Sequence, residues 1–115
     1  MKAANHRMAG AQAAQIVKVR LRHVSAATRR RRVAVARIVA ETIWRRWHRN
    51  VDGWQLKHVI WYLRHATKAH APNTKYQHWL CLRFLIAETG RGHWLRSLKG
   101  DWLTPTGSSV ENRRV

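Results

Sequence analysis

The chain has 115 residues, enough for one small domain with its tails. It carries 23 Lys and Arg against five Asp and Glu, which gives a formal net charge of +18. This charge excludes an acidic regulatory protein, and the five acidic residues form no close pair of the kind that a two-carboxylate hydrolase needs. Because 45% of the residues are hydrophobic and seven are Trp, the chain can still form a core. These numbers favour a folded protein that binds a polyanion such as nucleic acid.

The sequence offers little for metal, disulfide or membrane chemistry. Cys81 is the single cysteine, and the eight His include no pair four residues apart that could bind zinc from one helix face. We therefore expect no metal and no cofactor. No apolar run is long enough to span a bilayer, and no secretory signal is visible, so we expect a cytoplasmic protein. An organellar transit peptide is the alternative for residues 1–40, which contain no acid and are rich in Ala and Arg.

The positive charge is concentrated at the front of the chain, with +12 in residues 1–50 and +6 in the remainder. Residues 16–24 alternate between apolar and basic side chains, which is typical of a strand. The spacing of Ala13, Val17 and Leu21 also fits a helix. We interpret residues 1–24 as a flexible basic arm that becomes ordered when it binds its partner.

A long amphipathic helix is predicted over residues 26–48, with Ser25 as its N-cap. Its apolar positions recur at three- and four-residue spacing, from Val33 to Trp47. Four consecutive Arg, residues 29–32, lie in its first turns, where cations oppose the helix dipole. Such a placement is unfavourable for the helix itself, which indicates a binding role, although a solvated run of charge would look the same.

A second helix is predicted with Asp52 as its N-cap, because Gln55 follows three residues later as in a capping box. Its core stripe would run from Leu56 to Leu63. The opposite face would be aromatic and basic, and it could either contact a partner or pack on a neighbouring helix. That face consists of Trp54, His58, Trp61 and His65.

A third helix is predicted over residues 72–89, with Pro72 at its first position and Gly90 just past its end. It is apolar nearly all round, so it should be the central buried helix. A short helix near residues 93–99 and a tail over residues 104–115 complete the chain. The predicted fold is therefore all-α, a compact bundle of three main helices and a short fourth within residues 25–103.

The order of these helix starts resembles the core-binding, SAM-like N-terminal domain of tyrosine recombinases of the phage integrase type. The similarity covers residues 25–102. The first helix starts with Ser25 and Thr28. The second is opened by Val51-Asp52 and has Leu56 and Leu63 inside. The third starts with Ala71-Pro72-Asn73-Thr74, which is followed by Leu80 and Leu82-Arg83-Phe84. One departure is Ala71, at a position where that family often has a capping Ser.

The resemblance implies duplex DNA binding in a mobile-element context of recombination and integration. The family's catalytic domain, with its Arg, Lys, His-x-x-Arg and nucleophilic Tyr, has no counterpart after Trp102, and Tyr62 and Tyr76 lie inside predicted helices. We therefore expect no enzyme activity. A bacterial, phage or plasmid protein at the nucleoid is implied, which could self-associate or bind a full-length recombinase.

In that family the first and third helices straddle DNA, and the Arg run adds phosphate-binding charge. The phosphate contacts would give affinity with little sequence choice. The expected DNA-binding residues are Arg29, Arg30, Arg31, Arg32, Arg37, Thr74, Lys75, Gln77 and His78.

Two other functions fit the same composition. An RNA-binding or ribosome-associated protein would use the same basic front and would stack Trp54 and Trp61 on bases. A phage or plasmid interaction protein would instead dock on an acidic partner.

Overall fold

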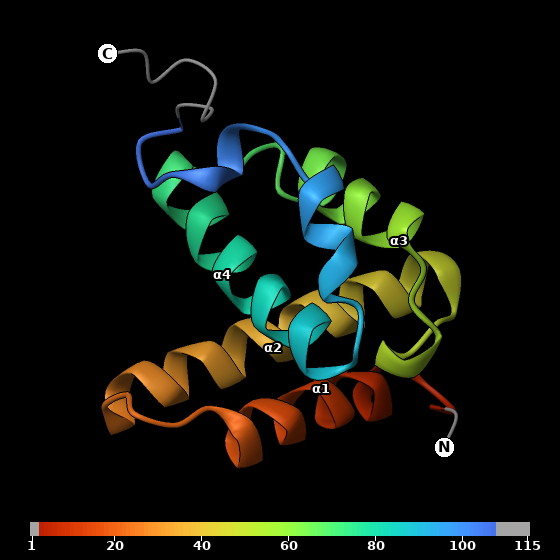
Figure 1. The fold of residues 1–115 in the computed structure, drawn as a ribbon. Coiled ribbons are helices and arrows are strands. Elements are labelled where there is room, and N and C mark those ends of the chain that lie inside the picture. The colour runs from red at the N-terminus through yellow and green to blue at the C-terminus, as the bar shows by residue number, and fades with distance from the viewer. Residues whose placement is uncertain (1–2, 108–115) are drawn as a thin grey trace.

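The computed structural model describes residues 3–107, which form helices joined by turns (Figure 1). The predicted all-α class is confirmed. No helix in these residues is long and apolar enough to cross a membrane. The elements in chain order are α1 (His6–Arg20), α2 (Ala26–Trp47), the 3₁₀ turn η1 (Val51–Gly53), α3 (Leu56–Trp61), its π-helical continuation η2 (Tyr62–Ala66), α4 (Pro72–Glu88), and the 3₁₀ segments η3 (Gly92–Ser97) and η4 (Asp101–Leu103).

The first helix, α1, corrects the prediction of a flexible arm over residues 1–24. It begins after Asn5, whose side chain accepts a hydrogen bond from the Met8 amide at 2.9 Å. Ala9, Ala13 and Val17 are at most 1% exposed, and they follow one another at four-residue spacing. The alternation over residues 16–24 was misleading because it overlaps only the end of an Ala-rich segment, and Ala has the highest helix propensity.

The second helix, α2, has the predicted bounds to within one residue. Ser25 caps it by accepting a hydrogen bond from the Thr28 amide at 3.1 Å. It ends where His48 adopts a left-handed conformation with φ of 55°. Its buried stripe, from Ala36 to Ile43, packs between α1 and α4.

The third helix, α3, begins at Leu56 with Gln55 as its N-cap, and not with Asp52 as its N-cap as predicted. The guanidinium of Arg91 donates hydrogen bonds to the backbone carbonyls of Val51 at 2.9 Å and Asp52 at 2.5 Å, so η1 forms a separate turn. The Gln55 amide then donates to Nδ1 of His58 at 2.9 Å, which caps α3. The sequence pattern placed the N-cap three residues too early, because Arg91, which holds η1, lies far along the chain.

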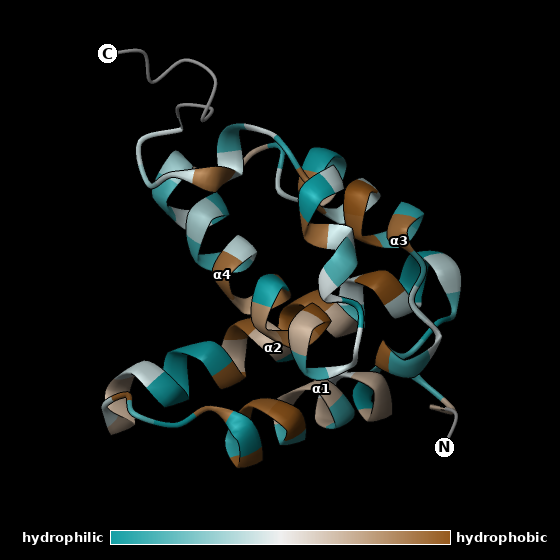
Figure 2. Ribbon diagram, in the orientation of Figure 1, coloured by the Kyte–Doolittle hydropathy of each residue, from teal (hydrophilic) through white to brown (hydrophobic). Residues whose placement is uncertain are grey.

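The fourth helix, α4, is central as predicted, and Gly90 follows its end with a positive φ of 79°. Leu82, Leu85 and Ile86 are fully buried in its middle and last turns. Leu98, which directly follows η3, and Trp102 of η4 close the core over α4. Figure 2 shows the apolar segments of α2 and α4 facing one another inside the bundle. Residues 108–115 of the predicted tail lie outside the described residues.

The contact between α1 and α2 is unusually close at Gly10. A Cβ built on Gly10 would lie 2.9 Å from Cγ of Arg37 and 2.9 Å from Cγ of Glu41. The absence of a side chain at Gly10 therefore lets the two helix backbones approach, and Ala9, Ala13 and Ala14 continue the same small-residue face.

Replacing Gly10 by Val should lower the free energy of unfolding by about 1–3 kcal/mol, because the added carbons must displace the stems of Arg37 and Glu41. Chemical denaturation followed by circular dichroism measures this value. Ala11→Val is the matched control, since Ala11 is exposed on the same helix and should lose less than about 1 kcal/mol. Equal losses in the two variants would show that the close approach does not limit stability.

Candidate nucleic-acid interface

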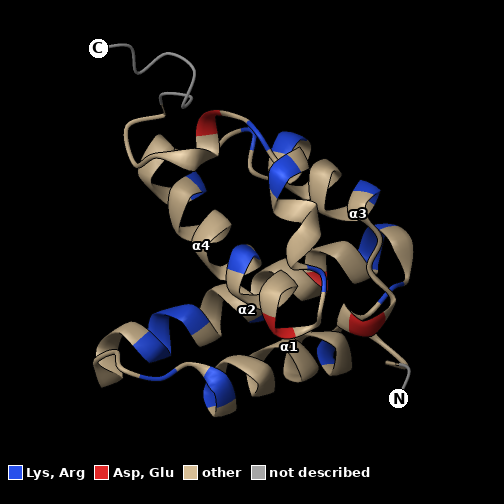
Figure 3. Cartoon of the chain, in the orientation of Figure 1, with Lys and Arg blue, Asp and Glu red and all other residues tan. Residues whose placement is uncertain are grey.

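The densest positive charge lies where α1 ends and α2 begins. Eight of the twenty residues 18–37 are Lys or Arg, and none is acidic. Because α1 and α2 form an antiparallel hairpin, the end of one and the start of the other meet at one corner of the molecule (Figure 3). We call this set the basic corner. It comprises Lys18, Arg20, Arg22, Arg29, Arg30, Arg31, Arg32 and Arg37.

Hydrogen bonds within the hairpin fix the shape of the basic corner. The Arg29 guanidinium donates to the carbonyl oxygen of Leu21 through Nε at 3.3 Å and Nη2 at 3.1 Å. This fork connects the first turn of α2 to the end of α1, and the Ser25 cap fixes where α2 starts. These hydrogen bonds hold the cations of α1 and α2 in a defined position relative to one another.

A shallow open groove of about 460 Å³ lies between the end of α1 and the first three turns of α2. Its cationic lining comes from Lys18 on α1 and from Arg29, Arg30 and Arg37 on α2. Ala26, Val33 and Ala34 form the rest of the lining, and no acidic side chain contributes to it. The arrangement suits an anion, because the amide end of α2 adds the positive end of a helix dipole to four formal charges.

The remaining Arg of the run differ from one another in exposure. Arg31 is exposed, whereas Arg32 is partly buried and its Nε has no hydrogen-bond partner among the described residues. The carbonyl oxygen of Arg32 accepts a hydrogen bond from Sγ of Cys81 at 3.6 Å, so this residue lies against α4. Burial raises the pKa of the Cys81 thiol to about 12, so the thiol stays protonated and unreactive.

The predicted contacts on α4 are only partly available. Thr74 is exposed and Gln77 is half-buried, but Lys75 forms an ion pair with Asp101 at 3.0 Å. α4 contacts Arg32 at Cys81. Lys75 lies six residues before Cys81, which corresponds to about 9 Å along the axis of α4. The structure therefore groups the Arg of α2 with Lys18 of α1 and leaves the start of α4 outside this group.

His78 was predicted to contact DNA, and this is wrong because its side chain is 6% exposed. Its Nδ1 forms a 2.8 Å hydrogen bond with the hydroxyl of Tyr62. Burial, with a smaller effect of His70, lowers the pKa of His78 to about 4, so the ring is neutral at physiological pH. Burial also raises the pKa of Tyr62, so its hydroxyl is not an accessible nucleophile.

Of the two alternatives for the aromatic face, packing on a neighbouring helix is the one that the structure supports. Trp54 is 3% exposed and His58 is 1% exposed, while His65 alone of the four is exposed. The His58 ring lies tilted against Trp47 of α2 with ring centroids 4.9 Å apart, and Trp61 meets Trp47 edge-on at 6.3 Å. Trp54 precedes α3, so it does not share a helix face with the other three.

Lys18, Arg20 and Arg22 are the residues of the basic corner that sequence reasoning did not select. Their charge was visible, but the segment was interpreted as an arm, and the position of α1 against α2 was needed to place them beside the Arg run. Within residues 3–107, no three His, Cys, Asp or Glu side chains lie together as a metal site requires. No family model, curated protein or solved structure matches the chain.

Trp54→Ala should lower the free energy of unfolding by roughly 3–5 kcal/mol, because the substitution leaves a cavity in the core. Thermal denaturation compared with that of His65→Ala, an exposed neighbour, measures the effect. An unchanged melting temperature in Trp54→Ala would contradict the burial of this ring.

The stability of the protein should fall as the pH is lowered from about 6.5 toward 4. The pKa of His78 is lowered from its ordinary 6.5 to about 4, so between these values the unfolded chain binds a proton that the folded chain does not. The contribution of His78 is about 3 kcal/mol, fully present above pH 6.5 and lost as the pH falls to 4. His78→Gln should flatten the decline, and an identical pH profile in this variant would refute the assignment.

Proposed function

We propose that the chain binds duplex DNA through the basic corner, without cleaving it. The observation that carries the proposal is the groove in which Lys18 of α1 lies beside Arg29, Arg30 and Arg37 of α2, with no acidic residue in its lining. Each such cation can neutralise a backbone phosphate and release a counterion. The contacts would position the chain on the duplex and read little sequence.

The chain's own electrostatics also favour a polyanionic ligand. The cations of the basic corner repel one another, and the first acidic residue along the chain is Glu41, which lies 3.9 Å from the Arg45 guanidinium further along α2. Bound phosphates would relieve this repulsion. Binding of a polyanion therefore lowers the electrostatic free energy of this surface more than binding of a neutral partner does.

Duplex DNA is favoured over single-stranded RNA by the burial of the aromatic rings. Stacking on unpaired bases requires an exposed ring face. Trp54 is buried, and Trp61 packs against Trp47 and Tyr62. These two residues were the basis of the RNA-binding alternative.

The recombination context of the proposal rests on the resemblance of the helix starts to the integrase core-binding domain. Under this proposal the chain occupies DNA without strand cleavage, because Tyr62 is buried against His78 and the described residues offer no exposed Tyr beside an Arg and His cluster. A role at the nucleoid, alone or beside a full recombinase, follows from the same resemblance.

The proposal is tested by fluorescence anisotropy with a labelled 20-bp duplex over about 50–200 mM salt. With about 6–10 phosphate contacts, the affinity should fall about 10³–10⁵-fold across this range. Arg30→Gln/Arg31→Gln should reduce the slope of log affinity against log salt by about two, since each lost phosphate contact removes about one.

The matched control is Arg64→Gln/Arg96→Gln, which removes the same charge from exposed sites on η2 and η3. The control should keep the slope of the unsubstituted chain. Absent or salt-independent binding, or equal slopes in the two double variants, would overturn the proposed interface. Tighter binding to single-stranded RNA of the same length would favour the RNA alternative instead.

A further inference from the structure

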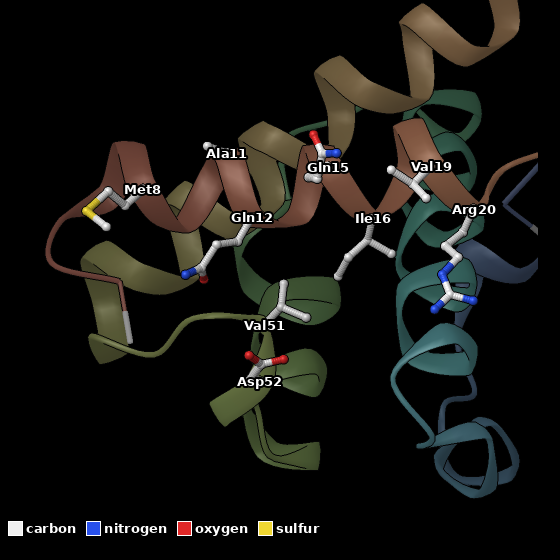
Figure 4. A pocket seen from close by; sticks show the side chains of 9 residues that line it. All are labelled: Met8, Ala11, Gln12, Gln15, Ile16, Val19, Arg20, Val51 and Asp52. Carbon is white, nitrogen blue, oxygen red and sulfur yellow. The ribbon is translucent and has the colours of Figure 1, made fainter. Parts of the chain in front are cut away.

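A second groove, of about 650 Å³, runs along the face of α1 that does not contact α2 (Figure 4). Its apolar side chains include Met8, which is 37% exposed, and Val19, which is 50% exposed. The basic corner and this groove share Arg20, but the groove between α1 and α2 that Lys18 lines has no lining residue in common with this one. The groove is lined by Met8, Ala11, Gln12, Gln15, Ile16, Val19, Arg20, Val51 and Asp52.

The lining residues of α1 follow the spacing of a helix-packing seam. Met8, Ala11, Gln15 and Val19 are separated by three or four residues, so they form one stripe along α1. From Met8 to Val19 the stripe is about 16 Å long, or three helical turns. Val51 of η1 lies on the side of α1 from which Gln12 and Ile16 project, as Figure 4 shows.

We propose that this groove binds an acidic amphipathic helix of a partner protein. A helix of about three turns fits the length of the stripe, and small Ala11 leaves room in the middle for a large apolar side chain from the partner. The exposed amide of Gln15 can hydrogen-bond to that helix. The mode is a helix laid into a hydrophobic groove.

The charges of α1 and of the whole chain favour an acidic partner. Arg20 lines one end of the groove, and Arg7 and Lys18 are exposed elsewhere on α1, whereas α1 contains no acidic residue. Asp52, on the opposite wall, is the one acidic residue that lines the groove. A second copy of this chain would bring another charge of +18 to the surface, so mutual repulsion opposes a homodimer.

The probe for the test is a synthetic 14-residue helix with Leu at alternating three- and four-residue spacing and Glu at most other positions. The Met methyl signals in NMR spectra of the full chain report binding, because Met8 lies in the groove and the only other methionine is Met1. The Met8 signal should shift on titration. A peptide of the same composition with a scrambled Leu pattern should leave it in place.

Val19→Asp and Ile38→Asp form a matched pair, because both side chains are 50% exposed and both variants lose one charge unit. Val19→Asp should weaken binding of the peptide at least about tenfold, and Ile38→Asp on α2 should leave it within about twofold. Ala11→Gln fills the groove without changing charge or disfavouring the helix, so it should also weaken binding.

Three outcomes would overturn the proposal. The peptide could fail to bind, it could bind equally to the Val19→Asp and Ile38→Asp variants, or it could bind regardless of its Leu pattern, which would indicate attraction by charge alone. Sedimentation of the unsubstituted chain supplies a further check. A dimer that Val19→Asp converts to a monomer would assign the groove to a second copy and not to an acidic partner.

Discussion

The close approach of α1 to α2 at Gly10 is the constraint on which the rest of the molecule depends. A side chain at this position would meet Arg37 and Glu41, so the two helices can lie this close only because Gly10 has no side chain. Their packing buries Ala13 and Val17 of α1 against Ala36 and Ala40 of α2 in one core. It also determines which side chains of α1 remain outside, and both proposed binding surfaces follow from that division.

The same packing concentrates charge that the chain could otherwise have dispersed. With α1 fixed, Lys18 lies beside the first turns of α2, and Arg29 holds the connection through the carbonyl of Leu21. Bringing these cations together costs electrostatic free energy, which a phosphate backbone would offset. The basic corner and the apolar groove adjoin at Arg20, near the end of α1, and otherwise use different residues.

Two His side chains lie in the interior among the aromatic rings. His58 packs on Trp47, and His78 hydrogen-bonds to Tyr62, both with a pKa lowered chiefly by burial. A neutral, hydrogen-bonded ring can be buried at little electrostatic cost, which explains how these two His lie in the core at neutral pH. The large positive charge is therefore carried by Arg and Lys at the surface, and the Trp-rich part supplies the support that holds them.

The sequence by itself determined α2 and α4, because their limits depend on local signals: the Ser25 cap, Pro72 at the first position and Gly90 past the end. It also located the Arg run of α2. Tertiary structure alone decided the rest. Arg91 shifted the start of α3 through contacts about 40 residues apart in sequence, and so turned Trp54 inward. Packing on α2 also stabilises α1 as a helix. The burial of its small-residue face favours the helix more strongly than the alternating pattern at its end favours a strand.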